Sequence, residues 1–204
     1  MAHKTLVIDL DRCLGCFSCE VACKMENGVA LGVYFNKVLT IGPTGTFPDV
    51  EMYFLPTVCQ ECADAPCVKV CPTGASYKTE DGIVLINKDI CIGCRYCMMA
   101  CPYGARSFNN DAKVVEKCTL CVHLQAIGEQ PACVKNCCGK ARLFGDIDDP
   151  ASDVSKALKA AGSDAVHSLP DVGNHPSVRY ILHRKTATWQ QSQPENTGRE
   201  SQNG

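Results

Sequence analysis

The sequence carries little net charge, contains no long apolar run and begins without a recognisable export signal. Its 20 Lys and Arg against 22 Asp and Glu give a formal charge of −2 over 204 residues, so no basic surface is expected to attract nucleic acid. No stretch approaches the ~18 consecutive apolar residues of a membrane-spanning helix. Any membrane association is therefore expected to come through a partner. Because the first residues show no signal peptide, we expect the thiols to stay reduced.

Patterns typical of acid–base or nucleophilic catalysis are also missing. No combination of Ser, His and Asp and no pair of carboxylates stands out as a catalytic site. The histidines lie outside the ligand patterns described below and are expected to be surface or hydrogen-bonded side chains: His3, His123, His167, His175 and His183. The chain by itself is therefore not expected to be an enzyme.

Cysteine, in contrast, is abundant. The chain contains 17 cysteines, a proportion that in a short secreted protein would indicate a disulfide scaffold. Here the number is odd, and most neighbouring cysteines are separated by two or three residues. This spacing favours thiolate ligands of a metal group over disulfides.

One stretch indicates which metal group is bound. Its sequence is Cys91-Ile-Gly-Cys94-Arg-Tyr-Cys97-Met-Met-Ala-Cys101-Pro102. The pattern C-x₂-C-x₂-C-x₃-C-P is the ligand pattern of bacterial [4Fe–4S] ferredoxins, in which three thiolates bind one cluster and the fourth binds a neighbouring cluster. The proline that follows turns the chain away from the site.

The pattern occurs four times, with gaps of different length. The first motif is Cys13-x₂-Cys16-x₂-Cys19-x₃-Cys23, the second is Cys59-x₂-Cys62-x₄-Cys67-x₃-Cys71, the third is the stretch above, and the fourth is Cys118-x₂-Cys121-x₁₁-Cys133-x₃-Cys137. A single C-x₂-C unit would also suit zinc, and a zinc-stabilised interaction module is the alternative. Zinc gives no role to the recurring x₃-C ending, so the motifs predict four [4Fe–4S] clusters.

The segments between the motifs predict an α+β fold. Strands are expected at residues 6–8, 33–41, 52–55, 83–86, 142–146 and 178–182, and turns at 80–82 and 109–111. Gly42-Pro-Thr-Gly45 is expected to end the second strand, and a helix is expected between Asp153 and Gly162. We expect two bacterial 2[4Fe–4S] ferredoxin-like modules with short strands, cysteine loops and short helices. They would occupy residues 1–146 with an insertion at 27–50, followed by a C-terminal extension (147–189) and a disordered polar tail (190–204).

The ligands can be assigned to clusters because paired ferredoxin motifs exchange their fourth cysteines. The second and third motifs are adjacent and both end in Cys-Pro, so they are expected to pair, which leaves the first and fourth motifs as the other pair. The predicted ligand sets are Cys59, Cys62, Cys67 and Cys101; Cys91, Cys94, Cys97 and Cys71; Cys13, Cys16, Cys19 and Cys137; and Cys118, Cys121, Cys133 and Cys23.

Longer sequence features resemble one family. The order of the motifs, the sequence from Asp89 to Ala105 and the sequence Phe144-Gly-Asp-x-Asp-Asp-Pro150 are similar to the iron–sulfur electron-transfer subunits of the dimethyl sulfoxide reductase class. That class includes the subunits of polysulfide, tetrathionate and arsenate reductases, and the resemblance covers residues 5–150. It implies a large catalytic subunit with a molybdenum or tungsten bis-pterin cofactor, and often a quinol-binding membrane anchor, with this chain passing single electrons between them.

Two alternatives stay open beside this resemblance. A polyferredoxin-like carrier, or a subunit of a hydrogenase, formate or carbon monoxide dehydrogenase system, would use the same arrangement of motifs. The resemblance also implies a place on the periplasmic side of the cytoplasmic membrane, reached by export together with a signal-bearing partner. A cytoplasmic location is the alternative.

The chain departs from the family at the end of the fourth motif, where Cys138 follows Cys137 in place of the usual proline. One interpretation is that Cys138 is a small buried thiol at the proline position. The other is that Cys138 replaces Cys137 as a ligand through a shift of one residue.

Overall fold

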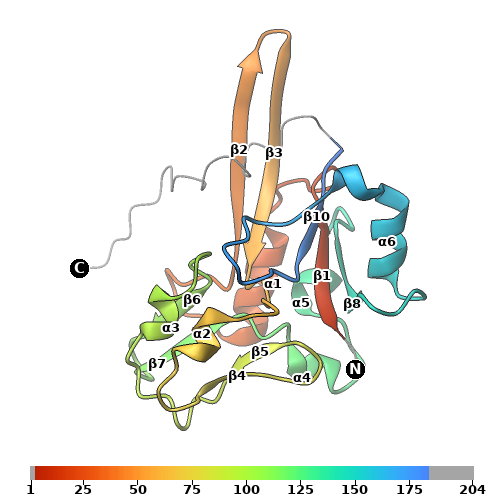
Figure 1. Cartoon of the computed structure of the whole chain (residues 1–204). Helices are drawn as coiled ribbons and strands as arrows, with labels where there is room; N and C mark the ends of the chain where they lie inside the picture. The colour runs from red at the N-terminus through yellow and green to blue at the C-terminus, as the bar shows by residue number, and fades with distance from the viewer. Residues whose placement is uncertain (1–2, 184–204) are drawn as a thin grey trace.

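The structure, a computed structural model, describes residues 3–183 (Figure 1). Its largest sheet has the strand order β8–β1–β10–β9. The strands are β1 (Lys4–Asp9), β8 (Arg142–Asp146), β9 (Val166–His167) and β10 (Arg179–Ile181). β1 lies between two other strands, and its residues Leu6, Val7 and Ile8 are fully buried. Their continuous apolar run suits an inner strand that is covered on both faces. The predicted tail at 190–204 lies outside the described residues.

The pairing of β1 with β8 joins the two ends of the motif region. β1 precedes the first motif and β8 follows the fourth, and the two strands are antiparallel with Ile8 opposite Arg142. β10 lies parallel to β1 on its other side. Strands from the predicted C-terminal extension therefore belong to the same sheet as the strand that leads into the first motif.

Two short hairpins connect the remaining motifs. They are formed by β4 (Ser76–Lys78) with β5 (Val84–Ile86), and by β6 (Arg106–Asn109) with β7 (Val114–Lys117). The first lies between the second and third motifs and the second lies between the third and fourth. The predicted turns at 80–82 and 109–111 are thereby confirmed.

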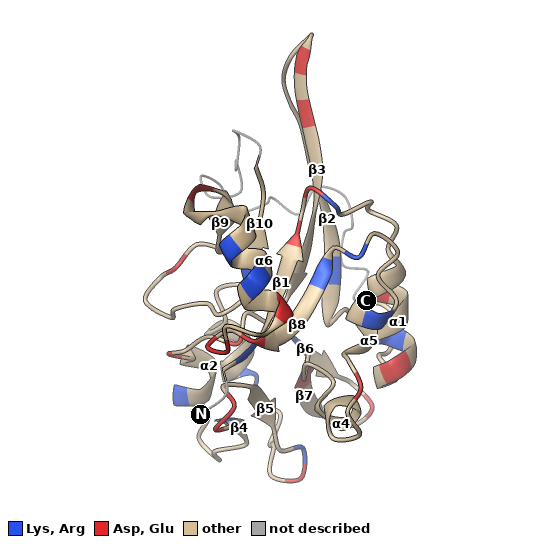
Figure 2. Ribbon diagram, turned by 90° about the vertical axis from the view of Figure 1, so that its right-hand side faces the viewer, with Lys and Arg blue, Asp and Glu red and all other residues tan. Residues whose placement is uncertain are grey.

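The second half of the predicted insertion (27–50) pairs with the residues that follow it, in a long antiparallel hairpin of β2 (Asn36–Thr46) and β3 (Asp49–Val58). The prediction that Gly42–Gly45 ends the strand is wrong: pairing continues after a register shift between Ile41 and Thr44. A β-bulge absorbs the irregular residues without ending the sheet. The hairpin projects from the body of the molecule (Figure 1), and acidic residues lie towards its tip (Figure 2).

The helices are mostly single turns. They are α1 (Ser18–Asn27), α2 (Pro66–Lys69), α3 (Tyr96–Met99), α4 (Val122–Gln125), α5 (Ala132–Lys135) and α6 (Asp153–Ala161), with a 3₁₀ turn at Ser163–Ala165. The predicted helix α6 is confirmed: the side chain of Ser152 accepts a hydrogen bond from the backbone N–H of Ser155, which satisfies a free donor of the first turn. Its residue Val154 is fully buried against Val7 and Ile181 of the sheet.

The motif cysteines make up much of the buried core. Eight of them belong to its clusters of packed side chains: Cys19, Cys23, Cys59, Cys62, Cys67, Cys97, Cys118 and Cys133. The fold is thus a mixed arrangement of short strands and helices, as the predicted α+β class requires, with thiols at its centre. Between residues 3 and 183 no helix has the length and hydropathy to cross a membrane.

Candidate metal centres

The four cysteine motifs share one backbone conformation. In each, the residue before the second cysteine has a positive φ: 62° at Gly15, 44° at Glu61, 66° at Gly93 and 51° at Leu120. Glycine adopts this region freely, but Glu and Leu do so at a cost. The same unusual backbone conformation at the same position indicates that the four motifs are copies of one loop, although two of them have Glu or Leu in place of glycine.

The third cysteine of every motif occupies the second position of a helix. Cys19 lies in α1, Cys67 in α2, Cys97 in α3 and Cys133 in α5. All four are at most 8% exposed. The fourth cysteine follows four residues later in each case. A loop followed by a helical turn therefore places three thiols of each motif together and directs the fourth elsewhere.

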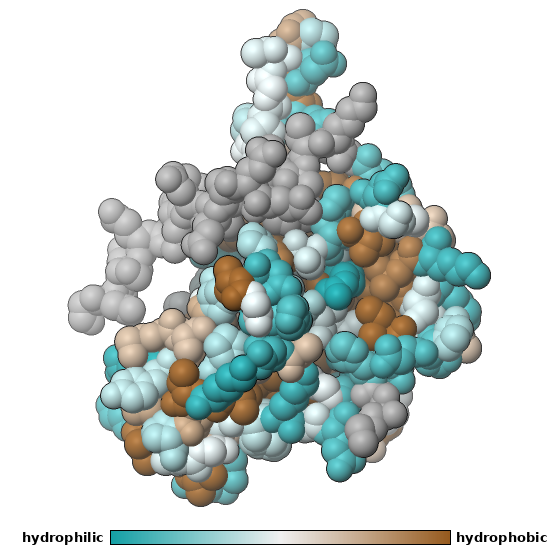
Figure 3. All heavy atoms as spheres, viewed as in Figure 1, coloured by the Kyte–Doolittle hydropathy of each residue, from teal (hydrophilic) through white to brown (hydrophobic). Residues whose placement is uncertain are grey.

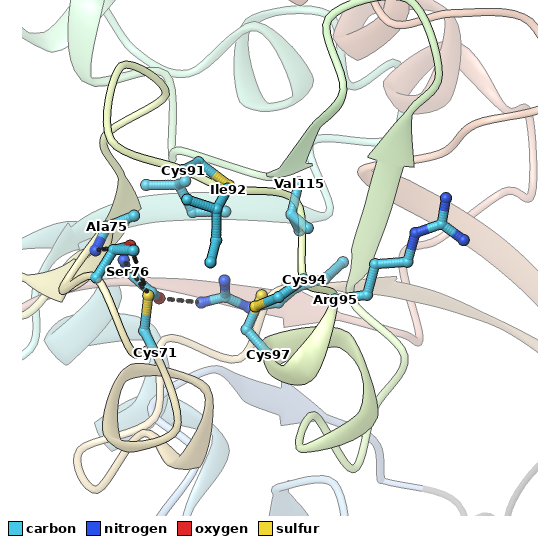
Figure 4. A pocket seen from close by; sticks show the side chains of 12 residues that line it. Cys71, Ala75, Ser76, Cys91, Ile92, Cys94, Arg95, Cys97 and Val115 are labelled. Carbon is cyan, nitrogen blue, oxygen red and sulfur yellow. Dashed lines mark hydrogen bonds between the residues drawn. The ribbon is translucent and has the colours of Figure 1, made fainter.

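One cavity contains thiols from two motifs (Figure 4). It is lined by Cys91, Cys94 and Cys97 of the third motif together with Cys71 of the second. The backbone N–H of Ser76 lies 3.4 Å from Cys71 Sγ. These four cysteines form one of the predicted ligand sets, and the structure places them around a common space.

Other contacts also bring the fourth cysteine of one motif to its predicted partner motif. Asn27 Nδ2 lies 3.7 Å from Cys23 Sγ and 3.8 Å from Cys121 Sγ, so it spans the first and fourth motifs. Cys101 acts electrostatically on Cys62 and Cys67. Cys137 acts in the same way on Cys13. Each exchanged cysteine is therefore near a motif other than its own.

The spacing of these thiols suits a larger group than a single ion. Within residues 3–183, no three His, Cys, Asp or Glu side chains converge closely enough to hold one metal ion. Tetrahedral zinc would need four ligand atoms about 2.3 Å from its centre. The four thiols that line the cavity of Cys71, Cys91, Cys94 and Cys97 match the four irons of a [4Fe–4S] cluster, each of which takes one thiolate.

Burial controls the protonation of these cysteines. Removal from water raises the pKa of Cys62 to about 11 and that of Cys23 to about 12, because the charged thiolate is poorly solvated. Without a bound group both thiols are protonated at neutral pH. Binding a metal cluster must therefore release their protons.

Comparison with known proteins agrees with these sites. Residues 50–147 match the family described as 4Fe-4S dicluster domain. The chain is 47% identical over 210 residues to the putative iron-sulfur subunit of a dimethyl sulfoxide reductase from Halobacterium salinarum, covering 89% of this chain and 79% of the relative. It is 43% identical over 208 residues to a sulfite dehydrogenase subunit from Allochromatium vinosum, covering 91% and 85%. It is 39% identical over 224 residues to the arsenate respiratory reductase iron-sulfur subunit of a Shewanella species, covering 86% and 94%.

The chain belongs to the iron–sulfur electron-transfer subunits of the dimethyl sulfoxide reductase class. The resemblance based on its motifs is thereby confirmed.

In this iron–sulfur subunit, functional groups other than cysteine also surround the thiols. Three basic side chains, Arg106, Lys117 and Arg142, are at most 5% exposed. Arg106 Nη2 donates to Cys67 Sγ at 2.9 Å. Arg106 Nη1, Arg142 Nε and Arg142 Nη2 are buried and have no hydrogen-bond partner. Buried donors of this kind fit an anionic cluster, which offers several sulfur acceptors.

Sequence reasoning missed these basic residues. A signal for two of them was present, because Arg106 and Arg142 each stand five residues after the fourth cysteine of their motif. Asn174, whose Nδ2 lies 3.0 Å from Cys62 Sγ, was missed too. It is 112 residues away along the chain and lies in no recognisable pattern.

The two cysteines at the end of the fourth motif have different surroundings. Cys137 Sγ accepts a hydrogen bond from the backbone N–H of Ala141 at 3.3 Å, much as Cys71 accepts one from Ser76. Cys138 is exposed, with its Sγ 3.4 Å from Ser18 Oγ. The interpretation of Cys138 as a buried thiol is therefore wrong, because the chain turns its side chain towards solvent. The geometry favours Cys137 as the ligand.

Serine substitution distinguishes the two cysteines. We expect Cys138→Ser to keep about sixteen irons per chain and Cys137→Ser to lose up to about four, since each [4Fe–4S] cluster contains four irons. The measurement is iron analysis with electron paramagnetic resonance (EPR) of the reduced protein, purified without oxygen. Full iron content in Cys137→Ser together with a deficit in Cys138→Ser would show that Cys138 is the ligand.

Gly93 tests the shared loop. A Cβ added there would lie 2.4 Å from the carbonyl oxygen of Lys113 and would also face a φ of 66°. We expect Gly93→Ala to lower the iron content. We also expect it to lower the free energy of unfolding by clearly more than the about 1–2 kcal/mol that left-handed strain alone would cost. Gly104→Ala is the control, because its φ is 58° and no atom lies within 4 Å of the added Cβ. Equal losses in the two variants would show that close packing at Gly93 is unimportant.

Proposed function

We propose that this chain holds four [4Fe–4S] clusters and passes single electrons between a molybdenum or tungsten bis-pterin catalytic subunit and a second redox partner, such as a quinol-linked membrane subunit. The observation that carries the proposal is the fourfold repetition of one loop and helix with cysteine at all sixteen ligand positions. The relatives, named as subunits of reductases and of a dehydrogenase, support a role within a larger complex.

Each proposed cluster is named after the motif that supplies three of its ligands. The motif-1 cluster takes its fourth ligand from Cys137, the motif-2 cluster from Cys101, the motif-3 cluster from Cys71 and the motif-4 cluster from Cys23. The cavity formed by Cys71 with the third motif and the position of Asn27 between Cys23 and Cys121 support this exchange.

The bound clusters would supply one-electron redox chemistry. The protein's part is to provide thiolates, to keep water from most of them, and to direct hydrogen bonds at the sulfur atoms, as Ser76 and Asn174 do here. Such contacts set the potential of a cluster. No bond to a substrate needs to form on this chain, which supports a non-catalytic role for it.

Two exposed ends are available for electron entry and exit. Cys16 of the first motif and Cys94 of the third are exposed, whereas most ligand cysteines are not. Val21 and Met25, near Cys16 along the chain, are 60% and 80% exposed, and Met99 of α3 is 74% exposed. Apolar atoms lie among the polar ones over the part of the surface where α2 and α3 are found (Figure 3). Exposed apolar groups beside accessible clusters support a contact surface at each end.

A charged residue at either end should weaken binding to one partner. We expect Met25→Glu to reduce the amount of one co-purifying subunit and Met99→Glu to reduce the amount of the other, while iron content stays at the level of the unaltered chain. The control is Ala160→Glu on α6 (Asp153–Ala161), which adds the same single negative charge at an exposed position away from both ends. The two-ended arrangement would be wrong if both variants kept every partner, or if both lost the same one.

Metal analysis of the native complex tests the whole proposal. The tagged chain, purified without oxygen from its host, should contain about sixteen irons and should bring down a large subunit with stoichiometric molybdenum or tungsten. The same iron content without either metal, and without a large partner, would instead support an electron carrier or a hydrogenase-type subunit.

A further inference from the structure

Three basic side chains are buried in the interior of this protein, and all three adjoin motif cysteines. Arg106 is 5% exposed, Lys117 is 2% exposed and Arg142 is 3% exposed. A buried positive charge is costly unless negative charge lies close to it. Among the ion pairs of residues 3–183, only Lys117 of the three has a carboxylate partner, at 3.0 Å from Glu61. The arginines must therefore be balanced by thiolates and by what the thiolates bind.

Arg106 lies between the proposed motif-2 and motif-3 clusters. Its Nη2 donates to Cys67 Sγ at 2.9 Å and to Ser76 Oγ at 2.8 Å. Ser76 in turn donates its backbone N–H to Cys71 Sγ. Arg106 also lines the cavity that contains Cys71 and the cysteines of the third motif. Its guanidinium thus touches a ligand of one cluster and the site of the next.

Lys117 lies between the motif-2 and motif-4 clusters. It immediately precedes Cys118, and its partner Glu61 immediately precedes Cys62. Its ammonium group also donates a hydrogen bond to the backbone carbonyl oxygen of Cys118. The Lys117–Glu61 pair, with side chains 1% and 0% exposed, therefore joins the two modules in the centre of the protein.

Arg142 lies between the motif-4 and motif-1 clusters. Cys133 of the fourth motif and Cys19 of the first pack in one buried group with Val38, which stands two residues after Asn36 in β2. Arg142 Nη1 donates to Asn36 Oδ1 at 2.9 Å, and the side chain's other buried donors have no partner. The preceding residue, Ala141, donates its N–H to Cys137 Sγ.

We propose that Arg106, Lys117 and Arg142 place one fixed cation in each of the three gaps of a linear cluster chain with the order motif 3, motif 2, motif 4 and motif 1. Each cation raises the potentials of both clusters beside it, because an added electron is stabilised by nearby positive charge. This inference rests on the proposed four-cluster function. In each step one cluster loses one electron and its neighbour gains it; no bond breaks, no proton moves and the cation keeps its charge.

The middle gap differs from the outer gaps. Glu61 compensates the charge of Lys117, whereas Arg106 and Arg142 have no ion pair with a carboxylate among the described residues 3–183. Removal of the Glu61 charge should therefore raise the potentials of the two clusters beside it. Removal or compensation of an arginine charge should lower the potentials of its two neighbours.

Redox titration of the purified complex, followed by EPR, tests the arrangement without prior assignment of the signals. Three variants change one gap each. Arg106→Gln removes a cation, Asn36→Asp adds a carboxylate of the same size next to Arg142, and Glu61→Gln leaves Lys117 uncompensated. We expect two midpoint potentials to move in each variant, downwards in the first two and upwards in the third.

The pattern of shared signals is the decisive result. Arg106→Gln and Glu61→Gln should have one shifted cluster in common, as should Asn36→Asp and Glu61→Gln, whereas Arg106→Gln and Asn36→Asp should share none. A linear chain in which the three charges occupy successive gaps, with the Lys117–Glu61 pair in the middle gap, produces this pattern. The inference would be overturned if all four midpoint potentials shifted in one variant. It would also be overturned if the potential of one cluster shifted in both Arg106→Gln and Asn36→Asp.

Controls separate charge from damage to the fold. Arg179→Gln should leave all potentials unchanged, because that guanidinium donates to the backbone carbonyls of Pro176 and Val178. Arg106→Lys should restore most of the shift seen in Arg106→Gln. If Arg106→Gln loses iron, the two variants of nearly unchanged shape, Asn36→Asp and Glu61→Gln, still decide the outcome.

Iron content separates this inference from the proposed function. Variants with about sixteen irons per chain and unchanged potentials would overturn the role of the cations and leave the four-cluster function intact. An unaltered chain with clearly fewer irons would instead contradict the four-cluster function itself.

Discussion

The structure depends on removing most of its motif cysteines from water. A lone thiolate in the interior is costly, and burial raises the pKa of Cys23 and Cys62 far enough that both are protonated when nothing is bound. Cysteines are three of the six buried residues in one of the smaller core clusters, and they also pack among the apolar side chains of the main cluster. If the proposed clusters are bound, we expect cluster binding and folding to be closely coupled. Such coupling would explain how a chain with single helical turns and strands of three or four residues can still form a stable fold.

The four loops show how this constraint selects residues. Gly15 and Gly93 adopt the left-handed conformation without strain, so the first and third motifs need no compensation. Glu61 and Leu120 are strained at the same position, and both side chains are buried. The carboxylate of Glu61 pairs with Lys117, and Leu120 fills the main core. A glycine at either position would relieve the backbone but would remove an interaction on which the interior depends.

The sequence predicted the sites better than their surroundings. The cysteine spacings reflect local geometry, since three of the four motifs span 11 to 13 residues and the fourth spans 20. For the same reason the helix at 153–161 was predictable from the residues at its two ends. The strand break at Gly42–Gly45 was predicted wrongly because pairing with β3 is not a local property. The buried basic residues were missed because Lys and Arg are usually exposed. Their burial becomes evident only when distant thiols are placed around them, although the repeat position shared by Arg106 and Arg142 was a usable signal.

Strand pairing also determines where the buried charges lie. Arg106 and Lys117 are directly opposite each other in the β6–β7 hairpin, and like charges in that position are unfavourable. The hairpin can bury both because Cys67 faces one cation and Glu61 faces the other. Arg142 begins β8 opposite Ile8 of β1, so the pairing that brings the first motif to the fourth also fixes a cation between them. In this chain the residues that pair the strands and the residues that bury positive charge are therefore in part the same.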